Sequence, residues 1–420
     1  MAGGGDVVLL SNGLYALSLE IVVSNEMLIK SLNGLGFVIV DGGNGCRCFS
    51  LSNCPCVLSG LTITNGWTDQ PGAGVYCGGS VPVITNCVVA GNHAGDNGGG
   101  VCNGTVNNCI ITGNWTENNR GGGVFGGTVN NCTIIGNQSK DGGGASHCRI
   151  SNSKICYNEA SDRGSGGGTF ISMVTNCTII GNSAWLGGGT WGGALRNCIV
   201  IDNTDSQPGS GDIVGNNVSF CCSPDLTHGE NGNITNAPMF VDVSATNYHL
   251  LAGSPCVDAG TDLSGQGMMH DFDGIPRPLD GDTNGVASWD IGCYEYVHPG
   301  ADSDSDGLLD TNELYGIGTN PADADTDDDG LDDGDELIAD TDPCDAGSVL
   351  WITNICPAGA GVRLDWQGGL QATQWLETTM CLTNDDWSAI FTNLPPTSSE
   401  ESVIYLGTNK QGIFRIKAGR

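Results

Sequence analysis

The stretch that recurs most regularly in this chain is Val129-Asn130-Asn131-Cys132-Thr133-Ile134. Its Asn-Cys step returns at spacings of 22, 23, 21, 24 and 21 residues, with Ser replacing Cys once, at Asn86, Asn108, Asn131, Asn152, Asn176 and Asn197. A glycine triplet and a second Asn, five residues after each Cys or Ser, keep the same register. A constant period of this length indicates a solenoid, in which each repeat forms one coil.

Side chains within each repeat alternate between apolar and polar, which indicates β-strands with one buried face. Val129 and Cys132, for example, have equivalents in Val106 and Cys109 one repeat earlier. The fixed leucine positions of a leucine-rich repeat are absent from the sequence. The pattern therefore predicts an all-β fold, a parallel β-helix with three short strands in a coil of about 22 residues.

Stacking of the coils places equivalent side chains roughly 4.8 Å apart. The second Asn of each repeat is then expected to hydrogen-bond to its equivalents above and below, as a ladder of Asn92, Asn114, Asn137, Asn158, Asn182 and Asn203. The cysteines are expected to form a column of small buried side chains, whose parallel Cβ directions do not suit disulfides. We expect these thiols to be reduced, at Cys87, Cys109, Cys132, Cys177 and Cys198.

The chain is strongly acidic, with 47 Asp and Glu against 14 Lys and Arg and a net charge of −33. Such a charge repels nucleic acid and anionic membranes, so neither is expected as a partner. No apolar run has the length of a transmembrane segment. Residues 1–6 also lack the charged and apolar regions of a signal peptide.

Residues 302–345 contain 17 Asp and Glu and no Lys or Arg. Two loops within them, 302–313 and 325–336, each offer oxygens at positions 1, 3, 5, 9 and 12, a backbone carbonyl at 7 and Gly at 6 for a sharp turn. This is the spacing of a calcium-binding loop, whereas an acidic linker would have no reason to keep it twice. The predicted ligands are Asp302, Asp304, Asp306, Leu308, Asp310 and Glu313, then Asp325, Asp327, Asp329, Leu331, Asp333 and Glu336.

Three stretches carry a resemblance to known solenoids. The repeat form seen in residues 179–189 is similar to that of polymorphic outer-membrane adhesins. Residues 4–15 resemble the first coil of pectate-lyase-like folds, and residues 254–260, 271–277 and 290–296 resemble the closing segment of secreted bacterial β-helices. The resemblance covers about residues 3–297 and implies a right-handed parallel β-helix, a fold that hosts lyases, hydrolases and binding proteins alike.

The acidic segment resembles thrombospondin type 3 repeats of bacterial surface proteins. The linking pieces around Asn320-Pro321 and Asp342-Pro343 match that pattern as well. The resemblance implies calcium as the bound cation, with Asp323 and Asp345 completing the two sites.

A polysaccharide lyase on a β-helix needs a basic residue to take the proton next to a uronate carboxyl group, and Lys140, Arg149 and Arg163 are the candidates. The variable loops between the ladder Asn and the glycine triplet are expected to stack along one corner. The candidate ligand-binding residues are Trp115, Arg120, Lys140, Arg163 and Trp185. The alternative for these loops is an ordinary solvated edge.

The sequence thus predicts a β-helix over residues 1–298, a short calcium-binding segment over 299–347 and a small β-sandwich-like module over 348–420. The expected function is a secreted or cell-surface, calcium-stabilised adhesin or glycan-binding protein, with a polysaccharide or cell-surface glycan as partner. The alternative is a polysaccharide lyase or glycoside hydrolase acting on an acidic polysaccharide.

Overall fold

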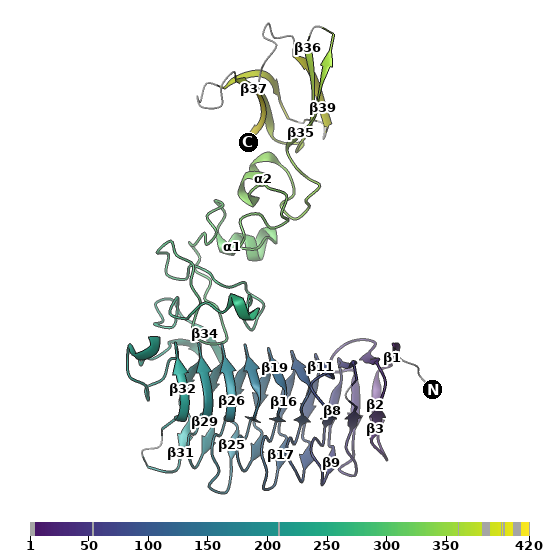
Figure 1. Cartoon of the computed structure of the whole chain (residues 1–420), viewed down its shortest axis with the longest axis vertical. Coiled ribbons are helices and arrows are strands. Elements are labelled where there is room, and N and C mark those ends of the chain that lie inside the picture. Colours follow the sequence, from purple (N-terminus) through teal and green to yellow (C-terminus); the bar gives the residue numbers. More distant parts are fainter. Residues whose placement is uncertain are drawn as a thin grey trace. The chain divides into compact units, whose positions relative to one another are not determined.

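The computed structural model describes residues 5–52, 54–208, 211–359, 361–379, 387–395, 397, 400–405 and 413–419. The chain divides into two compact units (Figure 1). The first comprises Met1–Asp282 with Ser288–Tyr296, and the second comprises Thr283–Ala287 with Val297–Arg420. The separate boundary near residue 347 stays a prediction.

The first unit is a parallel β-solenoid, as predicted, with three sheets that run along its length. Sheet A has sixteen strands in two limbs, which merge at the last coils. One limb contains β1 (Asp6–Leu10), β4 (Met27–Ser31), β7 (Cys56–Ser59), β11 (Val83–Thr85), β15 (Thr105–Asn107), β19 (Thr128–Asn130) and β23 (Arg149–Ser151). The other contains β3 (Ile21–Val23), β6 (Phe49–Leu51), β10 (Val75–Cys77), β14 (Val101–Cys102), β18 (Val124–Phe125) and β22 (Ala145–Ser146). Both lead into β26 (Thr169–Thr175), β29 (Thr190–Arg196) and β32 (Ile213–Ser219).

The other two sheets consist of short strands, one from each coil. Sheet B has nine: β2 (Gly13–Ala16), β5 (Val38–Asp41), β8 (Thr62–Thr64), β12 (Val88–Ala90), β16 (Ile110–Thr112), β20 (Thr133–Ile135), β24 (Lys154–Cys156), β27 (Thr178–Ile180) and β30 (Ile199–Ile201). Sheet C has seven: β9 (Trp67–Thr68), β13 (His93–Ala94), β17 (Trp115–Thr116), β21 (Gln138–Ser139), β25 (Glu159–Ala160), β28 (Ser183–Ala184) and β31 (Thr204–Asp205).

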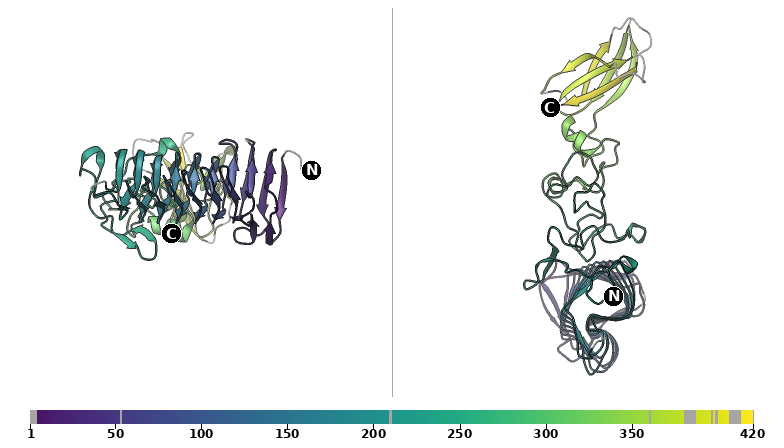
Figure 2. Two further views of the ribbon diagram at one scale, coloured as in Figure 1. Left: turned by 90° about the horizontal axis from the view of Figure 1, so that it is seen from below. Right: turned by 90° about the vertical axis from the view of Figure 1, so that its left-hand side faces the viewer.

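Equivalent residues of successive coils pair in the predicted register. Val129, for example, pairs with Val106 on one side and Ile150 on the other. Seen along the solenoid, the coils superimpose closely (Figure 2, right). The inward residues of sheets A and B form one continuous apolar core, which confirms the predicted buried face.

The predicted asparagine ladder is present at the corner between sheets B and C. Each side-chain amide donates to the next amide oxygen along the solenoid, from Asn92 through to Asn203, at 2.9–3.0 Å. The same side chains bond backbone groups at the corner. The ladder ends on Asp212, whose Oδ2 accepts from the Asn203 amide at 3.1 Å.

Asp212 makes the end of the ladder sensitive to pH. Burial, with the nearby charges of Asp225 and Asp202, raises its pKa to about 6, although hydrogen bonds from Asn203 oppose the shift. The raised pKa means that folding favours the protonated carboxyl group of Asp212. This group therefore stabilises the fold fully below its unfolded pKa, and the stabilisation is lost as pH rises through about 6.

Replacing Asp212 with Asn should therefore raise the free energy of unfolding by about 1 kcal/mol above neutral pH, allowing for solvent screening. Below about pH 4 the change should have little effect, because the wild-type carboxyl group is then neutral. Thermal unfolding at both pH values measures this, with the exposed Asp162→Asn as the control. Equal stabilisation at both pH values would contradict the argument.

The cysteine column runs inside the solenoid at the corner between sheets A and B, across sheet B from the ladder. Its members are almost fully buried, and the backbone N–H of each coil donates to the side chain of the next, as from Cys87 to the Cys109 Sγ at 3.4 Å. Ser153 continues the column by accepting from the Cys132 N–H through its Oγ at 3.1 Å. The column thus supplies acceptors to buried backbone amides as well as apolar volume.

These thiols should be free in the purified protein. Alkylation after unfolding without a reductant, followed by mass spectrometry, is expected to label Cys87, Cys109, Cys132, Cys177 and Cys198. Disulfides between neighbouring coils would contradict the stacking register.

The last part of the first unit folds back onto the solenoid. It contains η1 (Glu230–Gly232), β33 (Phe240–Asp242), β34 (Asn247–Leu250) and η2 (Ser264–Gln266). The Asn residues of three Asn-Cys steps hold it: Asn152 donates to His270 O at 2.8 Å, Asn197 donates to Thr261 O at 2.9 Å, and Asn176 contacts the Met268 sulfur. These contacts place the segment 264–268 beside the outward face of sheet A.

The second unit begins with short helical turns, α1 (Asp310–Asn312), η3 (Glu313–Ile317) and α2 (Asp333–Ala339). Two three-stranded antiparallel sheets follow. One is β35 (Trp351–Ala358), β36 (Gly361–Gln367) and β39 (Glu400–Tyr405), and the other is β38 (Ser388–Asn393), β37 (Thr373–Thr379) and β40 (Ile413–Gly419). Leu364 and Trp366 of the first sheet share a buried core with Leu376 of the second. No helix among the described residues has the length and apolar character needed to cross a membrane.

Candidate metal centre

Each acidic loop gathers its first three alternate carboxylates. Ligand atoms of Asp302, Asp304 and Asp306 lie within 4.8 Å of one another, and so do those of Asp325, Asp327 and Asp329. The glycine at position 6 has a positive φ in both loops, 95° at Gly307 and 97° at Gly330. Its N–H donates to the carboxylate at position 1, at 3.2 and 2.8 Å, so each chain turns tightly around its carboxylates.

Each loop also contains buried carboxylate oxygens without a hydrogen-bond partner among the described residues. They are Asp302 Oδ1, Asp304 Oδ2 and Glu313 Oε2 in the first loop, and Asp327 Oδ2, Asp329 Oδ2 and both oxygens of Glu336 in the second. Buried oxygens of this kind cost free energy unless a proton or a cation satisfies them. Several of them converge in each loop, which fits the oxygen cage of a hard divalent cation.

The raised pKa values of two glutamates in the loops also indicate a cation site. Burial raises the pKa of Glu313 to about 8, with Asp304 and Asp306 adding to the shift. Burial, opposed by Thr341 and reinforced by Asp329 and Asp327, raises the pKa of Glu336 to about 7. The carboxylate at position 12 therefore faces those at positions 3 and 5 in both loops. Its pKa is raised chiefly because burial disfavours the charged form, and the neighbouring carboxylates add to the shift.

The carboxylates at position 9 have a different environment from the others. Asp310 accepts from the Ser303 N–H and hydroxyl at 2.8 and 2.7 Å, and Asp333 accepts from the same groups of Thr326 at 3.0 and 2.8 Å. These bonds close each loop. Asp333 also lies within 4.8 Å of Asp306 and Glu313, so the second loop contributes a carboxylate to the first.

The remaining predicted ligands lie at the edges of the loops. Leu308 and Leu331 follow the glycines, and their N–H groups donate to Asp306 and Asp329 at 2.7 and 2.9 Å. Asp323 hydrogen-bonds through its backbone to Asp304, and the charge of Asp345 is one of those that raise the pKa of Asp327, after burial and Asp329. The two acidic clusters could therefore bind a metal, as the spacing predicted.

A third acidic cluster, in the closing part of the first unit, was not predicted from the sequence. Ligand atoms of Asp258, Asp280 and Asp282 lie within 4.8 Å of one another in the closing part of the first unit. Burial raises the pKa of Asp258 to about 6. Their spacing of 22 and 2 residues matches no loop motif, so the sequence offered no signal for this cluster.

The candidate residues on the variable loops lie on the sheet C side of the solenoid. Trp115 stacks on His93 with ring centres 3.4 Å apart, so one of its faces is covered. Arg120 forms an ion pair with Asp141 at 3.5 Å, and Arg163 lies over the Trp185 ring at 5.6 Å. Lys140 is exposed in the same stack of loops. The structure thus brings Arg163 and Trp185 together but shows no acid–base pair around them in its described part.

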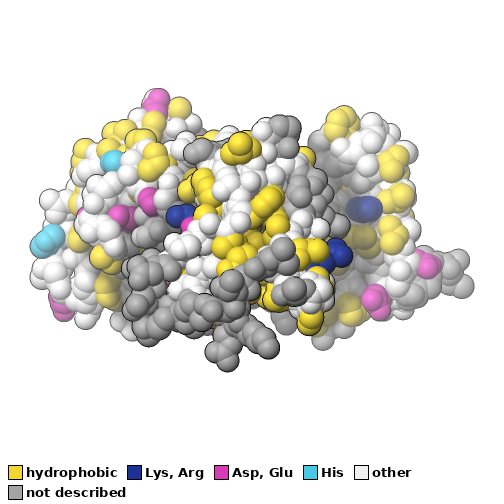
Figure 3. All heavy atoms as spheres, turned by 90° about the horizontal axis from the view of Figure 1, so that it is seen from above, with side chains coloured by type: hydrophobic (Ala, Val, Ile, Leu, Met, Phe, Trp, Pro, Cys, Tyr) yellow, Lys and Arg dark blue, Asp and Glu magenta, His cyan; other side chains and the backbone are white. Residues whose placement is uncertain are grey.

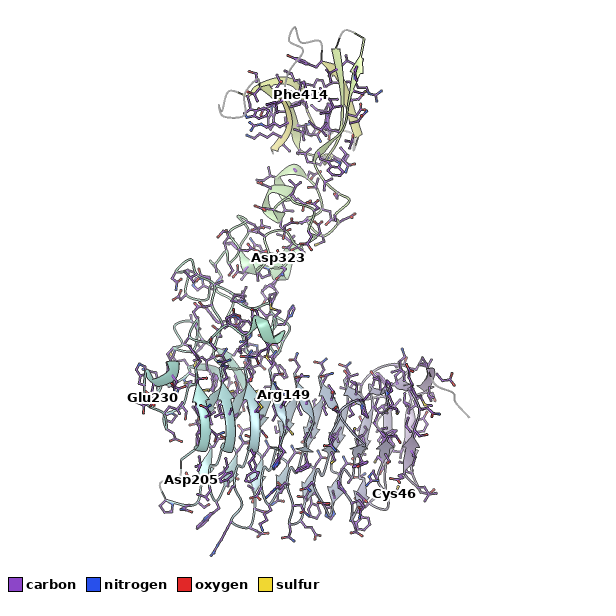
Figure 4. All side chains as sticks on the ribbon, viewed as in Figure 1. Cys46, Arg149, Asp205, Glu230, Asp323 and Phe414 are labelled. Atoms are coloured by element: carbon purple, nitrogen blue, oxygen red, sulfur yellow. The ribbon has the colours of Figure 1, made fainter. Side chains whose placement is uncertain are left out.

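Arg149 lies apart from these loops, on the outward face of sheet A (Figure 4). It lines an open groove of about 380 Å³ together with Met173, Gln266 and Met268. A neighbouring groove of about 480 Å³ shares Asn130, Ser151, Gln266 and Met268 with it. The groove is formed between sheet A and the segment 264–268, and no sequence pattern predicted it.

No family model matches the chain. No curated protein matches it either. Among solved structures, the pectate lyase Pel9A is similar, with a TM-score of 0.41 and 14% identity over 70% of this chain and 89% of that one. The β-solenoid assignment therefore rests on the parallel pairing of the chain's own strands.

Proposed function

We propose that this chain is an extracellular β-solenoid protein that binds glycans and is stabilised by calcium bound at loops 302–313 and 325–336. The observation that supports calcium most directly is the set of buried, unpartnered carboxylate oxygens in both loops. Calcium takes six to eight oxygen ligands in flexible geometry, whereas magnesium demands a stricter octahedron. Extracellular calcium-binding modules are filled by the calcium concentrations found outside cells, so calcium binding at these loops would favour an extracellular location.

The glycan-binding part of the proposal rests on the outward face of sheet A. Stacked coils present an extended surface on which equivalent side chains repeat at the strand separation of roughly 4.8 Å. On this face Asn107, Asn130, Ser151 and Thr175 pair in one line across successive coils. Amide and hydroxyl groups in such a line suit the repeated hydroxyl groups of a polysaccharide.

A glycan array on the intact, calcium-loaded chain tests this function. Binding to at least one class of glycan, retained after washing in calcium buffer, is the expected result. A folded, calcium-binding chain that binds no glycan would refute the glycan-binding role and leave a purely structural one.

The calcium ligands can be tested with two substitutions on the same helix. Glu336→Gln removes a buried charge from the second loop, so it should weaken calcium binding at that loop by about tenfold or more. Asp335→Asn removes one negative charge from an exposed neighbouring residue and should leave the calcium affinity unaltered. Isothermal titration calorimetry distinguishes them, and equal effects of the two substitutions would argue against Glu336 as a ligand.

A polysaccharide lyase is the second candidate, and one observation favours it. Arg149, a basic residue of the kind that a lyase uses to take a proton, lines an open groove on the solenoid. Incubation with uronic acid polymers would then release an unsaturated product that absorbs ultraviolet light. Arg149→Ala should abolish that product if Arg149 is the base.

A further inference from the structure

The outward face of one limb of sheet A contains no acidic residue among its paired positions, although the chain as a whole has 47 Asp and Glu. Two columns of outward-facing residues run along this face from coil to coil. One contains Leu9, Lys30, Ser59, Thr85, Asn107, Asn130, Ser151, Thr175, Arg196 and Ser219. The other contains Val7, Leu28, Val57, Val83, Thr105, Thr128, Arg149, Met173, Ala194 and Asn217. A negatively charged ligand would meet no like charge along these columns.

The polar side chains in the first column are already ordered by hydrogen bonds to one another. The Asn130 amide donates to Asn107 Oδ1 at 2.9 Å, and the Ser151 hydroxyl donates to Asn130 Oδ1 at 2.6 Å. Asn152, at the corner of the groove, donates to His270 O, while its buried Oδ1 has no partner in the described structure. A preorganised polar surface loses little entropy when a hydroxylated ligand binds.

The segment 264–268 gives this surface a second wall. Gln266, Gly267 and Met268 line the groove opposite sheet A, and Asn152 and Asn176 fix the segment through His270 and Met268. Met268 and Met173 add apolar contact area on the Arg149 side of the groove. A groove with an amide-lined floor and an apolar patch matches a sugar chain, which has hydroxyl edges and apolar ring faces.

Arg149 is the charged residue of this groove. Its guanidinium contacts the Met173 sulfur at 3.4 Å and forms no ion pair with any residue the structure describes. By contrast, Arg47, Arg120, Arg277, Arg363 and Arg415 are each paired with a carboxylate. Arg196 extends the exposed positive charge two coils further along the face, and Figure 3 shows how sparse Lys and Arg side chains are on the surface it displays.

We propose that this groove binds an acidic polysaccharide, with the Arg149 guanidinium holding a carboxylate of one sugar and the amide and hydroxyl column holding the hydroxyl groups of its neighbours. The inference rests on the glycan-binding role proposed above and specifies its site and its ligand class. A guanidinium binds a carboxylate through two parallel hydrogen bonds, which favours a uronate over a neutral sugar. Arg196 lies in position for a second carboxylate, roughly 10 Å along the solenoid at two strand separations.

Calorimetry with defined oligosaccharides on the full calcium-loaded chain tests the inference. The probes are oligogalacturonate, oligoalginate and a hyaluronan fragment, with a neutral galactan oligomer of matched length. At least one acidic probe should bind, and the neutral oligomer should bind about tenfold more weakly or not at all.

The site is tested by Arg149→Ala, which should weaken binding of the acidic probe by about tenfold or more. Arg149→Lys should bind the acidic probe more tightly than Arg149→Ala but less tightly than the wild type, because lysine keeps the positive charge but lacks the paired N–H donors of a guanidinium. Arg363→Ala removes an exposed arginine in the second unit and should leave binding unchanged. Thermal unfolding confirms that each variant is folded.

Two results would overturn the inference: unaltered binding by Arg149→Ala, or no preference for any acidic probe over the neutral oligomer. Either can occur while the glycan array still shows binding, in which case the glycan-binding role stands and only this site is wrong. A chain that binds nothing on the array refutes the function itself.

Discussion

Removal of calcium should loosen residues 302–345 and leave the solenoid intact. The two loops gather carboxylates whose buried oxygens have no protein partner among the described residues, so only protons or a cation can offset their repulsion. Near neutral pH the protons are partly lost, since the pKa values of Glu336 and Glu313 are about 7 and about 8. Backbone amides at Leu308 and Leu331 should then exchange at least about tenfold faster in the presence of a chelator.

Hydrogen exchange followed by mass spectrometry measures this with and without a calcium chelator. The coils from β11 to β30 provide an internal control, because their amides belong to sheet ladders that contain no acidic loop. Unchanged exchange over residues 302–336, or equal loosening of the solenoid, would contradict the proposed role of calcium.

Asn137→Ala should destabilise the solenoid by about 4 kcal/mol. The Asn137 amide donates to Ile111 O and to Asn158 Oδ1, both at 2.9 Å, while its Oδ1 accepts from the backbone and side chain of Asn114 at 3.0 Å. The side chain is almost fully buried, so alanine removes the acceptor of the Asn114 N–H and one donor each from Ile111 O and Asn158 Oδ1, at a site without access to water.

Chemical denaturation of the full chain, monitored in the solenoid by hydrogen exchange, measures this loss. Asn118→Ala, at an exposed loop position one coil earlier, makes the same chemical change without breaking the ladder and should cost less than about 0.5 kcal/mol. Similar losses for the two variants would show that the ladder contributes little to stability.

Much of the first unit follows from its sequence because the repeat fixes the register. Once Asn-Cys steps align, the positions of Val129, Ile150 and the ladder asparagines are determined by the stacking of identical coils. The clustering of carboxylates in loops 302–313 and 325–336 was also predictable, since these residues are local in sequence and the glycines mark the turn. Calcium itself and the thrombospondin-like identity of the segment stay predictions.

The groove could not be predicted because it combines distant parts of the chain. Gln266 and Met268 face Asn130 across it, more than a hundred residues apart in sequence and outside the repeat. The Asn-Cys step gave a partial signal, since its asparagines hold the closing segment in place. Likewise, Asp333 of the second loop lies beside Glu313 of the first, which loop spacing alone does not reveal.

Calcium stoichiometry tests the central claim most directly. Equilibrium dialysis of the decalcified full chain should find two calcium ions per chain bound at extracellular calcium concentrations. The variant Glu313→Gln combined with Glu336→Gln should bind neither ion under the same conditions. A chain that binds no calcium, or a double variant that still binds both ions, would contradict the account.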